Sequence, residues 1–297
     1  MTWGFFAIYS VIGWIIEVAY HAVTMGKVVN RGFLNGPLCP VYGSGVLMVF
    51  AALGFMGKLI GFDTDVGSMS VWALFFVGIV FATLVEFVAG FLLDKFFHAR
   101  WWDYRDRKFN LNGYICLQFS LIWGMAIAFV LRVVHPTFES LVEMIPESIG
   151  SVLLGVFYCI FLIDLVLTVM SVLKMNEQLR KMEELQKAIL TVSDGMSELI
   201  GERTMKTVDR VDKAKVLADK IMDEIALDSE AYKAEHEARR EELLARKSEL
   251  EAKLEHIRKQ IMYRRLFGTR RILSSNPNLM HDLYQDALDK LRDYISM

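Results

Sequence analysis

The sequence predicts an all-α protein: a polytopic membrane helix bundle of about five spans, followed by a long helical, coiled-coil-like arm. The first observation is that five apolar runs are long enough to cross ~30 Å of hydrocarbon as helices. The second is the distribution of charge, since 20 of the first 173 residues are charged against 48 of the remaining 124. The overall apolar share of 54% therefore combines two unlike parts, and a single soluble globule is excluded.

The expected spans all lie in the apolar part of the chain. The first run starts at Trp3 with no basic n-region or cleavage site before it, so we expect a membrane span and not a signal peptide. The second contains Cys39-Pro40 and two glycines in its first turns, and a partly unwound or re-entrant start stays open for it. The spans are expected at residues 3–23, 38–57, 71–97, 115–134 and 150–173.

The charges between the spans predict the orientation, because Lys and Arg gather on the cytoplasmic side of a membrane protein. The connections 23–37 and 95–113 hold most of these basic residues: Lys27, Arg31, Lys95, Arg100, Arg105, Arg107 and Lys108. The other two connections are mainly acidic: Asp63, Asp65, Glu139, Glu143 and Glu147, with Lys58 and Arg132. With five spans, the N-terminus is then expected outside and the arm in the cytoplasm.

Three carboxylates, Glu17, Glu86 and Asp164, fall within expected spans. Because a charge at bilayer depth is costly, such groups normally face the bundle interior and have a partner. Small or polar residues four apart share a helix face with two of them: Gly13 and His21 with Glu17, and Gly78, Ala82, Gly90 and Asp94 with Glu86. The carboxylates are expected to form a proton, cation or cationic-substrate site, or alternatively to hold the bundle together by pairing with Arg31, Arg105 or helix amides.

Two connections have the composition of binding sites. Residues 31–45 combine Arg31 with an Asn-Gly-Pro turn and several glycines, which suits an anion at a helix N-terminus. The alternative is a tight turn whose glycines serve helix packing. Residues 100–113 hold two adjacent Trp, a Tyr, two Asn and Asp103, which suits a ligand platform with cation–π contacts. The alternative there is an aromatic belt with snorkelling arginines.

Linked motifs in the apolar part resemble those of a known family. They are GWIIE at 13–17, RGFLNGPLCPVYG at 31–43, WWDY at 101–104, FNLNG at 109–113, ICL at 115–117 and SLIWG at 120–124. Together they resemble the bacterial family named Putative ABC-transporter type IV, or CmpB-like, over nearly all of the expected membrane domain. Residues 264–266 and the helix expected after Pro277 resemble its C-terminal tail more loosely.

The resemblance implies a permease-like, multi-pass subunit of a bacterial cell membrane, with any ATPase on a separate chain. The sequence itself has no G-x-x-x-x-G-K-[ST] phosphate loop, so it cannot be the motor alone. The family's motif residues coincide with those chosen above from their chemistry: Glu17, Arg31, Asn35, Pro37, Cys39, Pro40, Tyr42, Trp102, Asp103, Asn110, Asn112 and Gly113.

Other chemistry has less support in the sequence. Cys39-Pro40 has no second ligand at metal spacing, so we expect no metal, and three cysteines in apolar surroundings fit reduced thiols. A net charge of −2 provides no basic face for nucleic acid. No ATPase, hydrolase or dinucleotide motif occurs, so we expect no cofactor and assign no catalytic residue.

The charge-dense part is expected to be helical, because apolar residues recur in steps of three and four over 182–199 and 243–261. A self-associating coiled coil and a hairpin that folds back fit this pattern equally. Residues 262–273 then interleave four Arg with apolar groups, which suits anionic lipid headgroups or docking under the membrane-domain loops. An amphipathic helix is expected from Ser275-Asn276-Pro277 onward. The expected parts are a transmembrane domain (1–173), a helical arm (174–262) and a basic segment with a C-terminal helix (263–297).

The sequence supports three functional hypotheses. The first is a permease-like membrane transport component with an acid-containing cavity open to the cytoplasm, for a small polar or ionic solute. The second is a non-transporting module that binds a lipid or metabolite and uses the arm for oligomerisation or signalling, and the third is an intramembrane enzyme on a lipid headgroup. Expected partners are the bilayer, a second copy and a separate ATPase subunit. Candidate binding residues are Glu17, His21, Arg31, Asn35, Cys39, Tyr42, Glu86, Trp102, Asp103, Tyr104, Arg105, Asn110, Asn112 and Asp164.

Overall fold

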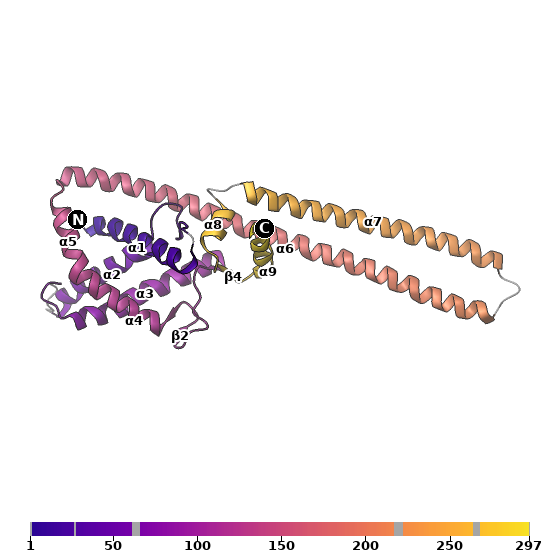
Figure 1. The fold of residues 1–297 in the computed structure, drawn as a ribbon, viewed down its shortest axis with the longest axis horizontal. Helices are drawn as coiled ribbons and strands as arrows, with labels where there is room; N and C mark the ends of the chain where they lie inside the picture. The colour runs from indigo at the N-terminus through magenta and orange to yellow at the C-terminus, as the bar shows by residue number, and fades with distance from the viewer. Residues whose placement is uncertain (1, 27, 61–65, 217–221, 264–267, 297) are drawn as a thin grey trace. The chain divides into compact units, whose positions relative to one another are not determined.

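The computed structural model describes residues 2–26, 28–60, 66–216, 222–263 and 268–296 (Figure 1). Some residues that entered the predictions above lie outside the described residues, namely Lys27, Asp63, Asp65 and 264–266. The chain divides into two compact units. The first unit comprises Met1–Asn176 and Arg264–Leu288, and the second comprises Glu177–Tyr263 and Asp289–Met297.

The first unit is a helix bundle, as the apolar runs predicted. Five helical segments of the described chain are long and apolar enough to cross a membrane. The fourth runs on to Glu143 and not to residue 134, because the chain continues through a π-helical turn, Val130–Val134, without a break. The helices of the bundle are α1 (Thr2–Met25), α2 (Pro40–Ile60), α3 (Val71–Phe97), α4 (Leu117–Phe129), α5 (His135–Glu143) and the first part of α6 (Glu147–Val216).

Small residues allow the helices to pack closely. A Cβ atom on Gly13 of α1 would collide with the ring of Tyr42 on α2. A Cβ on Gly78 of α3 would lie 2.7 Å from Cβ of Ile127 on α4. The stripe predicted from four-residue spacing on α3 is confirmed, since all five of its members are buried: Gly78, Ala82, Glu86, Gly90 and Asp94.

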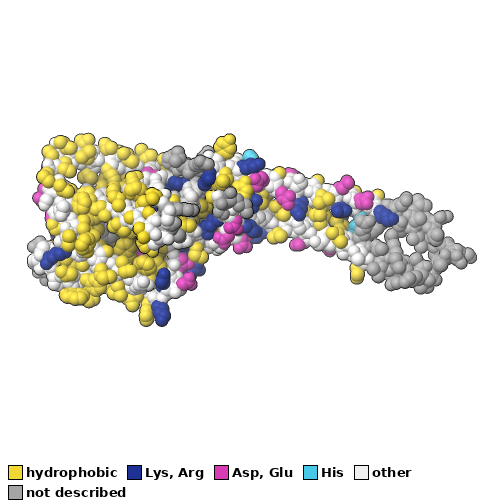
Figure 2. Space-filling view, viewed as in Figure 1, with side chains coloured by type: hydrophobic (Ala, Val, Ile, Leu, Met, Phe, Trp, Pro, Cys, Tyr) yellow, Lys and Arg dark blue, Asp and Glu magenta, His cyan; other side chains and the backbone are white. Residues whose placement is uncertain are grey.

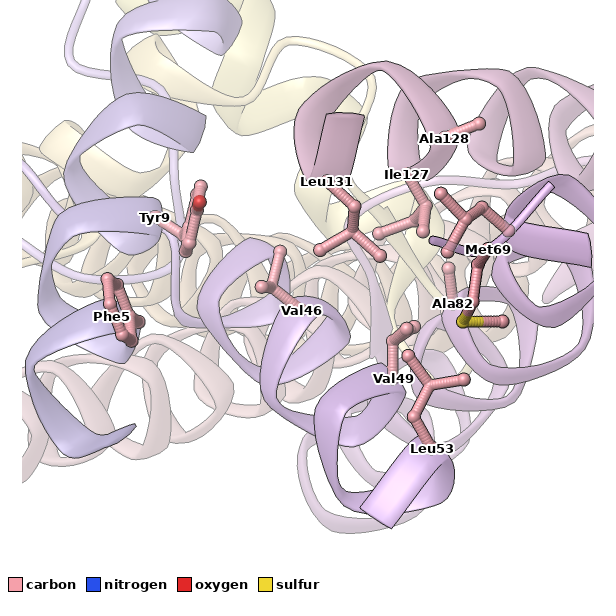
Figure 3. Packing of buried hydrophobic residues seen from close by; sticks show 11 residues of the cluster. Phe5, Tyr9, Val46, Val49, Leu53, Met69, Ala82, Ile127, Ala128 and Leu131 are labelled. Carbon is pink, nitrogen blue, oxygen red and sulfur yellow. The ribbon is translucent and has the colours of Figure 1, made fainter. Parts of the chain in front are cut away.

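The apolar core lies at one end of this bundle. It brings together the N-terminal half of α1, the middle of α2, the first half of α3 and the end of α4 (Figure 3). Its members include Phe5, Tyr9, Val46, Val49, Leu53, Met69, Leu74, Ile127 and Leu131. Figure 2 shows the apolar side chains that the spans expose on their outer surface, which is the composition that a lipid environment favours.

Two small antiparallel sheets accompany the helices, and the sequence did not predict them. One is a hairpin of β2 (Asn110–Leu111) and β3 (Ile115–Cys116). The other pairs β1 (Ala99–Arg100) with β4 (Met280–His281), so the C-terminal segment of the first unit joins the end of α3.

The helix expected from Pro277 onward begins later, so that prediction was wrong about its start. A short helix, α8 (Thr269–Ser275), ends there, and α9 begins only at Gln285 (Gln285–Ser296). Between α8 and α9, residues 280 and 281 pair with β1 as a strand and are therefore not helical. The His281 side chain also accepts the backbone N–H groups of Leu283 and Tyr284, which starts the turn into α9.

The second unit is a helical hairpin with part of α9. The end of α6 and α7 (Met222–Tyr263) lie side by side, and both line one groove (Figure 1). Members of the predicted apolar series are buried in both helices: Met182, Val192, Leu199, Leu254 and Ile261. The hydroxyl of Tyr294 donates to Glu255 at 2.7 Å, and Lys290 donates to Gln186 at 2.9 Å. Of the two arrangements that fitted the sequence, the structure has the hairpin; self-association stays a prediction.

Candidate functional site

The two motif-bearing connections, residues 28–39 and 98–116, meet at the end of the bundle opposite the core. We call this the motif end; α1 and α3 end there, and α2 and α4 begin there. Residues of both connections and of all four helices enclose a hollow with about 820 Å³ of empty space, open solvent included. We call this hollow the motif cavity. It therefore draws on sequence segments more than 90 positions apart.

Half of the predicted binding residues line the motif cavity: Glu17, Arg31, Cys39, Tyr42, Glu86, Trp102 and Tyr104. The sequence analysis did not select several other lining residues: Phe33, Leu93, Trp101, Trp123 and Asn276. Trp101 and Trp123 lie within the quoted motifs, so their position in the motif was an available signal. Asn276 arrives from the C-terminal segment, and no sequence signal placed it there.

One wall holds an ion pair. Nε of Arg31 lies 3.4 Å from Oε2 of Glu17, and the hydroxyl of Tyr42 donates to Oε1 of Glu17 at 2.7 Å. His21 is buried beside the cavity, with Nδ1 3.4 Å from Nη1 of Arg31. Both members of the ion pair are only partly exposed, so their charges offset each other at the cavity wall.

Glu86 faces the same cavity in a different setting. The hydroxyl of Tyr104 donates to Oε1 and the indole Nε1 of Trp123 donates to Oε2, each at 3.0 Å. The residue is 4% exposed. Within the described part of the chain, no Lys, Arg or His nitrogen lies within the 4.0 Å that defines an ion pair with it. Among the residues that the structure describes, this carboxylate therefore has neutral hydrogen-bond donors but no counter-charge.

Cys39 is a buried thiol. Its Sγ lies 3.8 Å from the carbonyl oxygen of Arg31, and burial, followed by the charge of Glu17, raises the pKa of Cys39 to about 12. A thiol with such a pKa is a poor nucleophile. No group of three or more His, Cys, Asp or Glu that could hold a metal occurs among the described residues.

A second, apolar cavity lies deeper in the bundle, with about 610 Å³ of empty space, open solvent included. Four residues line both cavities: Val41, Tyr42, Glu86 and Trp123. The rings of Tyr42 and Trp123 meet edge to face, with 5.3 Å between their centroids. The two cavities are therefore neighbours separated by this aromatic pair and Glu86.

Four predicted residues of the 100–113 connection shape the loop and do not line the cavity. Asp103 accepts the backbone N–H of Arg105 at 3.0 Å and its Nε at 2.7 Å. Burial raises the pKa of Asp103, but the hydrogen bonds and charge of Arg105 outweigh it, and the pKa lies below its usual value. Asn110 donates to the carbonyl of Arg107 at 2.7 Å, and the carbonyl of Asn112 accepts from Arg100 at 2.9 Å.

Two further predicted residues, Asn35 and Asp164, hold the first connection to α6. Asp164 accepts the backbone N–H and side-chain amide of Asn35 at 3.1 and 2.9 Å, and the backbone N–H of Gly36 at 2.8 Å. Neither side chain lines the motif cavity. His21, Asn35 and Asp164 therefore join the four loop residues above as members of the predicted set that do not line the cavity.

The C-terminal segment of the first unit covers the motif end. Arg271 is buried and donates to the carbonyls of Leu34 at 3.1 Å and Phe33 at 3.2 Å, and burial lowers the pKa of its guanidinium. Residues 262–273 were expected either on anionic lipid headgroups or docked under the loops of the membrane domain. The contacts of Arg271 support docking on the loops.

Further contacts fix this segment to α3 and β1. Nε of Arg100 lies 3.5 Å from Oδ1 of Asp282, and Nη2 of the same guanidinium lies 2.7 Å from Oδ2 of Asp94. The side chain of His281 lies 3.3 Å from Oδ1 of Asn176. Burial, helped by the charge of His98, lowers the pKa of His281 to about 4.

Comparison with known proteins gives one match. A family model described as Putative ABC-transporter type IV matches residues 4–169, which is more than half of the chain and includes both connections. This confirms the resemblance that the motifs predicted. No curated protein and no solved structure matches the chain.

Proposed function

Because this chain belongs to the Putative ABC-transporter type IV family, we propose that it is a permease-like component that binds a small polar or ionic solute in the motif cavity. The family and the five apolar helices fit a membrane transport component. The observation that carries the finer proposal is Glu86, a buried carboxylate that lines an open hollow and has no counter-charge among the described residues. Intramembrane acids in such a setting mark substrate and ion pathways.

In this proposal the cavity residues divide the work by charge. Glu86 binds a cation, a proton or a cationic group of the solute. Arg31 holds an anionic group, while Glu17, which accepts from Tyr42, fixes its guanidinium. Trp102 and Tyr104 supply flat aromatic walls. The other predicted residues, among them Asn35, Asp103 and Asp164, position the connections that carry these groups.

We place the motif end, and with it the mouth of the cavity, in the cytoplasm of a bacterial cell. The support is the positive charge of its connections, which includes Arg31, Arg100 and Arg107, against the acidic run Glu139–Glu147 at the other end. The N-terminus is then outside and the helical arm is inside.

Two partners complete the proposal. A separate chain would supply ATP hydrolysis, because this sequence has no phosphate loop. A second copy would associate through the arm, for which the apolar series on α6 and α7 and the groove between them are the support.

A binding module without transport is the second candidate. The observation that favours it is the contrast along the bundle axis, since the acids lie at the motif end and the apolar core lies toward the other end. A binding module needs one open mouth, whereas a transporter needs access from both faces.

The experiment that separates these candidates is purification of the protein from its host in mild detergent, followed by native mass spectrometry of the intact assembly. A nucleotide-binding subunit in fixed stoichiometry supports the transport component. A homo-oligomer that carries a small ligand and no ATPase overturns it in favour of the binding module.

A further inference from the structure

We propose that the ligand is an organic cation with an apolar tail: an alkylated ammonium group in the motif cavity beside Glu86 and a hydrocarbon chain in the second cavity. This inference rests on the proposed function, because it names the ligand class of the same site. Three properties of the two cavities support it: net charge, aromatic lining and polarity gradient.

The charge of the motif cavity favours a cation. Glu17 and Arg31 form an ion pair and cancel, whereas Glu86 has no basic partner within ion-pair distance among the described residues. An indole N–H can only donate, so the Oε2 atom that Trp123 contacts is an acceptor, and the hydroxyl of Tyr104 donates to Oε1. Burial of a carboxylate without a basic partner is costly, and a bound cation would offset this cost.

The aromatic lining favours an alkylated ammonium over a metal ion or a primary amine. Six aromatic side chains line the motif cavity: Phe33, Tyr42, Trp101, Trp102, Tyr104 and Trp123. Aromatic faces attract cations, and boxes of such residues recognise quaternary ammonium groups. A quaternary ammonium has no N–H group to donate, so it does not need a free acceptor on Glu86. The negative charge of the carboxylate attracts it even though both oxygens already accept hydrogen bonds.

The second cavity fits the tail. Apart from Glu86 and the two residues with polar tips, Tyr9 and Tyr42, the side chains that line it are apolar or indole, among them Ile12, Val46 and Ile127. Because Tyr42, Glu86 and Trp123 line both cavities, a chain attached to an ammonium beside Glu86 starts at the wall of the second cavity. A fully hydrophilic solute would leave this apolar space empty.

The first test is a chain-length series measured by calorimetry on the full chain in nanodiscs, with empty nanodiscs as the blank. The probes are tetramethylammonium, hexyltrimethylammonium and decyltrimethylammonium below their micellar concentrations. Decanoate, whose ten carbons include the carboxylate carbon, is the anion of similar chain length. Affinity should rise by up to about fourfold per added methylene until the chain fills the cavity. Decanoate should bind at least about tenfold more weakly than decyltrimethylammonium.

Matched variants separate head from tail. Glu86→Gln should weaken all three ammonium probes by about tenfold or more, whereas Asp106→Asn, an exposed acid of the same end, should leave them unchanged. A Cβ on Gly45 in the second cavity meets nothing within 4 Å, so Gly45→Leu fills this space. Gly45→Leu should abolish the increase in affinity with chain length and preserve tetramethylammonium binding. Gly54→Leu, at an equally open position of α2, is its control.

The outcomes distinguish this inference from the function on which it rests. Equal chain-length gains in Gly45→Leu and the parent protein would overturn the placement of the tail, and tight decanoate binding would overturn the charge class. Either result leaves the motif cavity as a solute site. An absence of ammonium binding would also overturn the inference, while the native mass spectrum would still decide between transport component and binding module.

Discussion

The two ends of the membrane bundle use the same helices in opposite ways. At the core end, apolar side chains of α1 to α4, such as Phe5, Leu53 and Leu131, fill the space between the helices. At the motif end, the helices hold carboxylates whose partners come from the connections as well as from other helices, as Arg31 and Tyr42 do for Glu17. The difference indicates that packing between helices stabilises the bundle at one end, whereas the other end depends on loops and is available for ligand chemistry.

The core end should show the largest effect on stability. Leu74→Ala removes a fully buried side chain of α3 and leaves a cavity, so we expect a loss of about 3 kcal/mol in the free energy of unfolding. Leu84→Ala on the same helix is the control, because that side chain is exposed and should cost far less. Thermal unfolding in detergent measures both, and equal losses would contradict the placement of the core.

The docked C-terminal segment should make the motif end sensitive to pH. In the folded state the pKa of His281 is about 4 against the ordinary 6.5, so the unfolded chain binds its proton first as pH falls. The stabilisation is then complete above pH 6.5 and is lost as pH falls toward 4, by up to about 3 kcal/mol.

The matching measurement is thermal unfolding between pH 7.5 and 4 of the parent protein and of His281→Gln. The difference between the two curves should shrink across this window. A difference that does not depend on pH would contradict a neutral, docked His281. The other histidines titrate in both proteins, so their contribution cancels in the difference.

A smaller effect is expected at the contact between Arg271 and the first connection. Arg271→Ala removes the donors of two carbonyls and should cost about 2 kcal/mol of docking free energy. The readout is the rate of limited proteolysis within residues 268–288, which should rise about 30-fold, since 1.4 kcal/mol corresponds to a factor of ten. Arg107→Ala, an exposed arginine of the second connection, should leave the rate unchanged.

The smallest effect should come from the loop network. Asp103→Asn keeps an acceptor for the backbone of Arg105 and removes only an ion pair to a half-exposed guanidinium. We expect a loss below about 1 kcal/mol and unchanged ligand affinity. A large loss of affinity with normal stability would move Asp103 from the loop network to the binding surface and would sharpen the description of the motif end.

Sequence reasoning was most successful where one helix decides the outcome. The four-residue spacing from Gly78 to Asp94 predicted the buried face of α3, because α-helical periodicity alone sets which side chains share a face. The hydropathy pattern predicted the five spans, although the continuation of the fourth to Glu143 depends on a π-helical turn that has no strong sequence signal.

Contacts between distant segments were the features that the sequence could not provide. The sequence analysis selected Asn110 and Asp164 as binding residues, but only the folded loops reveal that they bond to backbone groups outside the cavity wall. Asn276 and β4 reach the motif end from the C-terminal segment, and strand pairing there overrode the helix expected after Pro277. Such outcomes depend on tertiary partners and not on local propensity.

The central claim is that the motif cavity holds a ligand through Glu86. Its most direct test is native mass spectrometry of the parent protein, Glu86→Gln and Asp106→Asn, each purified from the same host in mild detergent. The account predicts a small-molecule adduct on the parent and on Asp106→Asn that is absent from a folded Glu86→Gln protein. The same adduct at the same occupancy on all three proteins would contradict it.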